Sequence, residues 1–131
     1  MPLQPNIALE TIKSLADEGQ IESHETDDLI FAAGDPGECL YAILEGSVTI
    51  EWGQGIDEQL QAGDCFGFDV MVDPEERRYC SAKAASHLKL LPLNRERFLL
   101  AIQEFPMFAL ENLRVLDERL RRLKTRAVSN P

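Results

Sequence analysis

Hydrophobic and polar positions follow a helical spacing near the beginning of the chain. Ile7, Ile12, Leu15 and Ala16 recur at mostly helical intervals, and a glycine follows shortly after them. Apolar residues three and four positions apart share one face of a helix, and a glycine commonly ends a helix. We therefore predict a short amphipathic helix over residues 7–18.

In the middle of the chain the period changes, and short segments rich in β-forming residues are separated by glycine-containing turns. Many short strands at regular turn spacing are typical of a sandwich or barrel. We predict a mainly β fold with flanking helices, in which a jelly-roll-like β-roll of about eight strands occupies residues 29–93. The clearest strand segments are residues 29–31, 39–44, 47–52, 58–60, 79–85 and 87–93.

The last part of the chain returns to a helical period. Asn94 can cap one helix that stops before Pro106, and Pro106 suits the first turn of another, so the C-terminal helices are expected over residues 94–125. Such a helix packs either on its own domain or on a second copy as a coiled coil, and the sequence leaves both open. Its apolar residues, spaced alternately four and three apart, are Ala109, Leu113, Leu116, Leu120, Leu123 and Ala127.

The length of 131 residues fits a single domain over residues 1–131. The longest apolar runs are a few residues, far below the roughly 20 that cross a bilayer. No basic residue precedes an apolar stretch at the N-terminus, so no signal peptide is expected. We therefore expect a cytoplasmic location and no membrane partner.

The formal net charge of −10 is unevenly distributed. Residues 1–76 contain 18 acidic residues and one basic residue, Lys13, which gives −17, whereas residues 77–131 contain 12 basic and 5 acidic residues, which gives +7. An acidic chain of this kind lacks the basic surface of a DNA-binding domain. We therefore expect no nucleic-acid partner, and we expect any anionic ligand to be bound by the second part of the chain.

The cysteines and histidines give no sign of a metal or catalytic site. Cys39, Cys65 and Cys80 form no CxxC pair, which fits neither a disulfide framework nor a zinc site, so we expect reduced, buried thiols. His24 and His87 are isolated in the sequence. A cupin-like enzyme, the most distant of the three functions that we consider, would therefore lack its metal ligands. No nucleophile motif or phosphate-binding loop is present either. We expect a non-enzymatic binding domain without metal or cofactor.

One pattern of glycines and apolar residues indicates the fold more specifically than composition or charge does. It runs Gly34-x-x-Gly37-x-x-Leu40-Tyr41-Ala42-Ile43-Leu44-Glu45-Gly46-Ser47-Val48 and continues with Leu60-x-x-Gly63-Asp64-Cys65-Phe66-Gly67. Together with the flanking helices, this pattern resembles the β-roll of the cyclic nucleotide-binding domain family, over nearly all of residues 7–126. The turns, the apolar pattern and the helices agree with one another, which makes the resemblance specific.

The resemblance implies a ligand site. In that family the ligand lies in a phosphate-binding cassette, a loop and short helix between two strands, which matches residues 66–84 here. Arg78 falls on the arginine whose guanidinium binds the phosphate of cyclic AMP or cyclic GMP. Gly67 would let the backbone approach the ligand, and Tyr79 and Ser81 would lie beside the phosphate.

The chain departs from the family pattern at one cassette position. Phe68 stands where the family has a glutamate that accepts a hydrogen bond from the ribose hydroxyl. Asp69 is adjacent, but the next residue along the chain points in another direction. A lost hydrogen bond to a charged acceptor costs about 1.5–3 kcal/mol. We therefore predict cyclic nucleotide binding in the micromolar range or weaker, roughly 10- to 100-fold below a member that keeps the glutamate.

Two functions compete on these observations. The first is a small-ligand sensor that binds a cyclic nucleotide or a related anion and changes the angle of its terminal helices. The alternative is a degenerate domain that acts as a dimerisation or protein-docking module without nucleotide. In both cases we expect a homodimer through the helix over residues 106–125. Because the chain ends at Pro131, we expect no helix-turn-helix domain after that helix.

Overall fold

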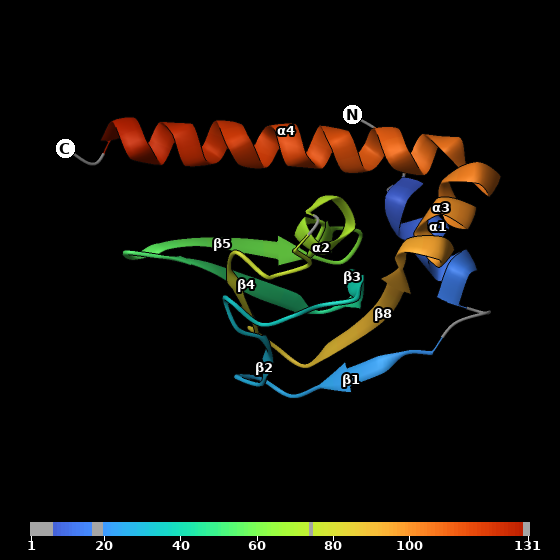
Figure 1. Ribbon diagram of the computed structural model, residues 1–131, viewed down its shortest axis with the longest axis horizontal. Coiled ribbons are helices and arrows are strands. Elements are labelled where there is room, and N and C mark those ends of the chain that lie inside the picture. Colours follow the sequence, from blue (N-terminus) through green and yellow to red (C-terminus); the bar gives the residue numbers. More distant parts are fainter. Residues whose placement is uncertain (1–6, 17–19, 74, 130–131) are drawn as a thin grey trace, which may run out of the picture.

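The computed structural model describes residues 7–16, 20–73 and 75–129, and it contains eight strands and four helices in those residues (Figure 1). The strands are β1 (Glu22–His24), β2 (Leu29–Phe31), β3 (Cys39–Glu45), β4 (Ser47–Gly53), β5 (Ile56–Gln61), β6 (Cys65–Phe66), β7 (Ser81–Ala84) and β8 (Leu88–Asn94). The helices are α1 (Ile7–Ala16), α2 (Asp69–Val72), α3 (Arg95–Glu104) and α4 (Pro106–Ser129). This arrangement confirms the predicted fold class.

The strands form two antiparallel four-stranded sheets, with the orders β1-β8-β3-β6 and β2-β7-β4-β5. Side chains alternate along each strand, so that in β4 Val48 and Ile50 are buried while Glu51 is exposed. Apolar side chains from both sheets, including Ile43, Leu60 and Leu90, fill the inside of the roll.

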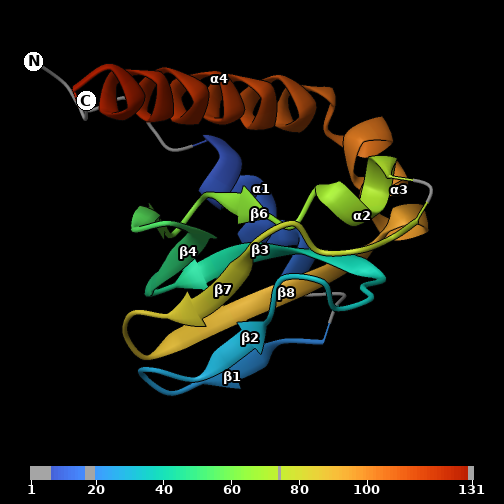
Figure 2. The same cartoon turned by 60° about the vertical axis from the view of Figure 1, so that its left-hand side comes forward.

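A second apolar layer lies between the roll and the helices. Ile12 of α1, Ala101 of α3 and Phe108 of α4 are buried there against residues of β3 and β8. Asn94 caps α3, because its side-chain oxygen accepts a hydrogen bond from the Arg97 amide at 2.8 Å. From this layer α4 extends over the roll, so that its C-terminal part lies above β4 and β5 (Figures 1 and 2).

The boundaries differ from the sequence prediction at two places, and a third boundary lies outside the described residues. The roll begins with β1, before the predicted start at residue 29, because a short polar strand carries no apolar alternation and is defined by its pairing with β8. The last helix continues to Ser129, four residues beyond the predicted end. The first helix is described to Ala16, and residues 17 and 18 of the predicted helix lie outside the described residues.

No helix of the described ranges is both long enough and apolar enough to span a membrane. Those same ranges contain no group of three or more His, Cys, Asp or Glu side chains that could hold a metal ion. Cys39, Cys65 and Cys80 are free thiols; Cys65 and Cys80 are buried, as expected from the sequence, and Cys39 is half-buried.

Candidate ligand-binding site

The predicted cassette connects β6 to β7. The chain leaves β6 at Phe66, turns at Gly67, forms the four-residue helix α2 and returns to β7 at Ser81. Gly67 has a φ of 88°, a left-handed conformation that side-chain-bearing residues rarely adopt. A glycine at this position therefore allows the turn that directs α2 away from the sheet.

Arg78 lies beneath the cassette, with its side chain only 2% exposed. Its Nη1 donates to the Gly67 carbonyl at 3.1 Å and to Asp69 Oδ1 at 3.2 Å, and its Nη2 donates to the Cys39 carbonyl at 2.5 Å. The guanidinium carbon lies 4.1 Å from the centre of the Phe31 ring, a cation–π distance. The arginine thus hydrogen-bonds to acceptors on β3 and the cassette and stacks on an aromatic ring of β2.

Two glycines provide the space that this guanidinium occupies. A Cβ on Gly37 would lie 2.5 Å from Arg78 Nε, and a Cβ on Gly67 would lie 2.6 Å from Arg78 Nη1. Both distances are too short for any real side chain. Arg78 Nε itself is buried without a hydrogen-bond partner, which fits its close packing against Gly37.

Asp69 fixes the beginning of the cassette helix. Its Oδ1 accepts hydrogen bonds from Arg78 and from the Val70 amide, and its Oδ2 accepts one from the Tyr79 amide at 2.9 Å. The Tyr79 hydroxyl donates to Asp73, and the Tyr79 side chain remains exposed. The carboxylate therefore joins the two arms of the cassette through Arg78 and Tyr79.

Phe68 connects the cassette to the helices. Its ring meets Phe98 of α3 edge-on at 5.9 Å, and Phe98 in turn lies 6.2 Å from Phe108 of α4. Aromatic pairs at these distances are favourable beyond the area they bury. The side chain at the family's glutamate position thus packs against apolar neighbours.

A cavity of about 360 Å³ lies between the cassette, the β4–β5 hairpin and α4. This volume is at the small end of the usual range for ligand sites. Its walls are Trp52, Glu58, Gly67, Phe68, Asp69, Tyr79, Cys80, Leu116, Arg119, Leu120 and Leu123. Four of the predicted site residues, Gly67, Phe68, Asp69 and Tyr79, are therefore brought together at one cavity.

Arg78 and Ser81 are not in the wall of this cavity. Arg78 is held behind the cassette by the contacts given above, and the Ser81 hydroxyl accepts a hydrogen bond from the Ala33 amide at 2.9 Å. Their predicted contacts with a phosphate stay predictions.

A buried ion pair at the same cavity was not predicted from the sequence. Arg119 of α4 donates from Nε to Glu58 Oε1 at 2.8 Å and from Nη2 to Glu58 Oε2 at 3.0 Å. Trp52 Nε1 also donates to Glu58 Oε2, at 2.5 Å. A signal was available, because Glu58 occupies an inward-facing position of β5, two residues before the buried Leu60.

The titration of two wall residues reflects this environment. Burial raises the pKa of Glu58, but hydrogen bonds from Arg119 and Trp52 outweigh that effect, so its pKa is below the ordinary value. Burial raises the pKa of Cys80 to about 11. Glu58 is therefore charged and Cys80 is neutral near pH 7.

The β-roll, the cassette, the glycine-cradled arginine and the covering C-terminal helix agree with the architecture that the sequence resemblance implies. The model of the cyclic nucleotide-binding domain family matches residues 21–105. The chain belongs to this family.

Individual proteins that are similar to this chain support its membership of the family. The chain is 31% identical over 98 residues to a CRP-like cAMP-activated global transcriptional regulator of Mycobacterium tuberculosis, covering 71% of this chain and 43% of the relative. The catabolite activator protein of Thermus thermophilus is 29% identical with a TM-score of 0.68, over 92% of this chain and 59% of that one. The c-di-GMP-responsive regulator CLP of Xanthomonas campestris has the same fold, with 20% identity and a TM-score of 0.78 over 91% and 62% of the two chains. This chain therefore spans less than two thirds of each of these proteins.

Proposed function

We propose that this domain is a regulatory sensor that binds a small ligand in the cavity beside the cassette and transmits binding through α4. The observation that carries the proposal is that the cassette and α4 form walls of one cavity. Phe68 and Asp69 supply one side, and Leu116, Arg119 and Leu120 supply the other. A ligand in this cavity would contact both elements at once, so its binding energy would depend on their separation.

The C-terminal part of α4 is suited to such movement. Its N-terminal part is fixed by Phe108 and Asn112, both buried. Farther along, long side chains reach down to β5, where Arg119 pairs with Glu58 and Arg126 donates to the Asp57 carbonyl. A helix held by a few polar contacts changes position at lower cost than one embedded in an apolar core.

Within this proposal, cyclic AMP or cyclic GMP is the first ligand to test, because the chain is similar to a regulator named as cAMP-activated. Binding is expected to be weak for two reasons. Phe68 offers no acceptor to a ribose hydroxyl, and Arg78 already donates to Asp69 and two carbonyls. A phosphate would have to replace Asp69 on this guanidinium.

Calorimetric titration with both nucleotides tests this function. We expect dissociation constants in the micromolar range or weaker, and a further loss in Arg78→Lys, which cannot reproduce the planar fork. Arg77→Lys is the matched control, because Arg77 is the exposed neighbour that donates to the Gly34 carbonyl. Equal affinities in the wild type and Arg78→Lys would exclude Arg78 as the phosphate ligand.

A second candidate function is a dimerisation or protein-docking module. In this case the domain is non-enzymatic and cytoplasmic, and it binds no nucleotide. The observation that favours it is a set of apolar side chains more than half exposed along α4, namely Met107, Leu110, Leu113 and Leu120. A homodimer through α4 is compatible with both functions, because Met107, Leu110 and Leu113 lie outside the cavity wall, and of this set only Leu120 also lines the cavity.

A further inference from the structure

The charged side chains in the wall of the cavity, Glu58, Asp69 and Arg119, are already paired. Glu58 is bound by Nε and Nη2 of Arg119, and the Glu58 and Arg119 side chains are 8% and 10% exposed respectively. Asp69 is bound by Arg78 from behind the cassette. Among the described wall residues, no cation is left to neutralise an added anion, and burying an unpaired charge is costly.

The remaining wall is largely apolar. Trp52, Phe68, Cys80, Leu116, Leu120 and Leu123 contribute side chains from the hairpin, the cassette and α4. The Cys80 thiol is neutral near pH 7, because burial raises its pKa to about 11. Flat apolar molecules gain most from such walls, since binding removes their surface from water.

One polar group of the wall is free to meet a ligand. Arg119 uses Nε and Nη2 on Glu58, and its Nη1 donates no hydrogen bond to any residue in the described part of the chain. The Arg119 side chain is 10% exposed and lines the cavity. It can donate to an acceptor without giving up Glu58.

We propose that the cavity binds an uncharged, flat, largely apolar ligand with one hydrogen-bond acceptor, which Arg119 Nη1 binds in place of the cassette arginine. This inference rests on the proposed sensor function and specifies its ligand. It makes Arg119 the residue that determines specificity, and it leaves Arg78 as a support of the cassette.

Three matched probes test the charge and the acceptor separately. They are naphthalene bearing at one position an acetyl group, a carboxylate or an ethyl group, so that ring size is constant while the substituent is a neutral acceptor, an anion or neither. Cyclic AMP is titrated beside them. The fluorescence of Trp52, the single tryptophan of the chain, reports occupancy, because its side chain lines the cavity.

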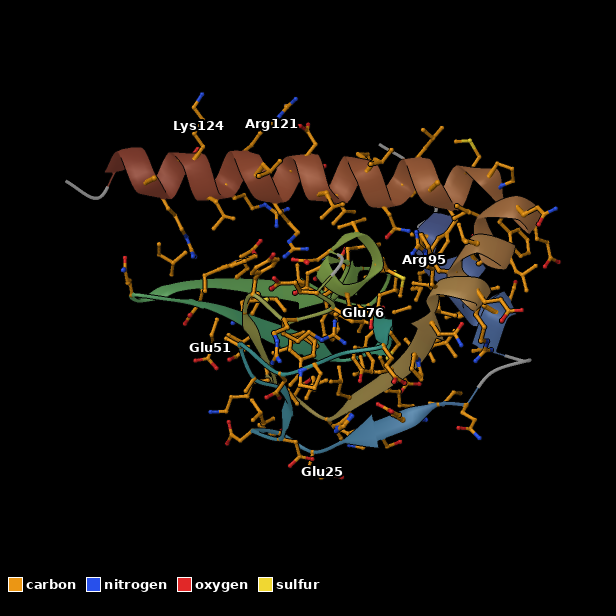
Figure 3. The ribbon with its side chains drawn as sticks, viewed as in Figure 1. Glu25, Glu51, Glu76, Arg95, Arg121 and Lys124 are labelled. Atoms are coloured by element: carbon orange, nitrogen blue, oxygen red, sulfur yellow. The ribbon has the colours of Figure 1, made fainter. Side chains whose placement is uncertain are left out.

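Two variants distinguish the hydrogen bond from Arg119 from a general effect of removing a positive charge from α4. The double variant Glu58→Gln with Arg119→Met removes the donor without leaving a buried unpaired charge. Lys124→Met is the control, because Lys124 is on the same helix and its side chain points away from the roll (Figure 3). Circular dichroism of each variant verifies that it is folded.

We expect acetylnaphthalene to bind at least about ten-fold more tightly than naphthoate or cyclic AMP, since only the neutral acceptor meets Arg119 without an unpaired charge. The double variant should lose roughly ten-fold in affinity for acetylnaphthalene and little for ethylnaphthalene, as expected for one lost hydrogen bond. Lys124→Met should bind all probes like the wild type.

Tighter binding of naphthoate or cyclic AMP would overturn this inference while leaving the sensor function intact. Equal loss for the acetyl and ethyl probes in the double variant would overturn the role of Arg119. If none of the four compounds changes Trp52 fluorescence at millimolar concentration, both this inference and the sensor function are wrong, and the docking function is favoured.

Discussion

Arg78 supports the cassette from beneath, and the glycines around it are the reason that it fits. Its guanidinium occupies the volume where Gly37 and Gly67 lack side chains, and it joins Cys39 of β3 to Asp69 of α2. The family's glycine pattern therefore has a packing explanation in this chain that does not require a ligand.

Replacing Gly67 tests this explanation. Gly67→Ala should destabilise the fold by about 1–2 kcal/mol through its positive φ, plus about 1–3 kcal/mol because the new Cβ meets Arg78. Gly34→Ala is the control, since Gly34 has a φ of 90° and open space around its Cβ position. Urea unfolding of both variants measures the difference; equal losses would mean that Arg78 moves aside freely.

The Glu58–Arg119 pair should make stability depend on pH. The folded pKa of Glu58 lies below its ordinary value of about 4.3. Its contribution is therefore present above that value and is lost as pH falls through the folded pKa. Glu58→Gln should cost about 3 kcal/mol at pH 7 by leaving Arg119 buried and unpaired, and the deficit should shrink below about pH 4.

Urea unfolding of Glu58→Gln and the wild type at both pH values tests this pH dependence. The exposed Glu51, which lies on the neighbouring strand β4, provides the control variant Glu51→Gln (Figure 3). If the loss of unfolding free energy in Glu58→Gln were the same at pH 7 and at acid pH, the pKa of Glu58 would not differ between the folded and unfolded states.

At the scale of single residues, the sequence indicated which residues lie in the cassette better than it indicated which groups each side chain contacts. The cassette position of Arg78 was implied by the resemblance to the cyclic nucleotide-binding domain family, and in the structure Arg78 lies between α2 and β7. Its hydrogen bonds to the protein did not follow, because the acceptors on Gly67 and Cys39 are backbone carbonyls that no sequence pattern marks. The pairing of Glu58 with Arg119 was missed because 61 positions separate the two residues.

At the scale of elements, strand and helix periods predicted most of the architecture. The long strands β3, β4 and β8 and the helices after residue 94 have clear apolar periods, and they lie where predicted. Two short strands, β1 and β6, are defined by their pairing with β8 and β3, so local pattern gave little information. The apolar seam of α4 also divides: Leu116, Leu120 and Leu123 line the cavity, whereas Leu113 is exposed and lies outside the cavity wall.

This division sharpens the dimer prediction. If two copies associate through α4, Leu110→Glu and Leu113→Glu, at exposed leucines outside the cavity wall, should each convert the dimer to a monomer, because a charge would be buried among leucines. Light scattering should show about twice the chain mass for the wild type and the chain mass for the variants. Leu99→Glu on α3, at a similarly exposed leucine, is the control. A monomeric wild type would contradict the prediction.

At the scale of the whole molecule, the uneven charge follows the architecture. The part with a net charge of −17, residues 1–76, contains β1 to β6, and the part with +7 contains α4. Arg119 and Arg126 of α4 contact β5 of the acidic part. Attraction between the two parts therefore favours the observed position of α4 over β5, in addition to the specific ion pair.

Hydrogen exchange along α4 should show how this position is maintained. Phe108 and Asn112 fix the first part in the buried layer, so its amides should exchange slowly in every variant. The part beyond Arg119 depends on the pair with Glu58, whose removal in Glu58→Gln with Arg119→Met should accelerate exchange there by about ten-fold, or roughly 1.4 kcal/mol. Lys124→Met should leave both parts unchanged. Uniform acceleration over the whole helix would mean that the pair stabilises the entire fold, and α4 would then be too rigid to transmit binding by moving one end alone.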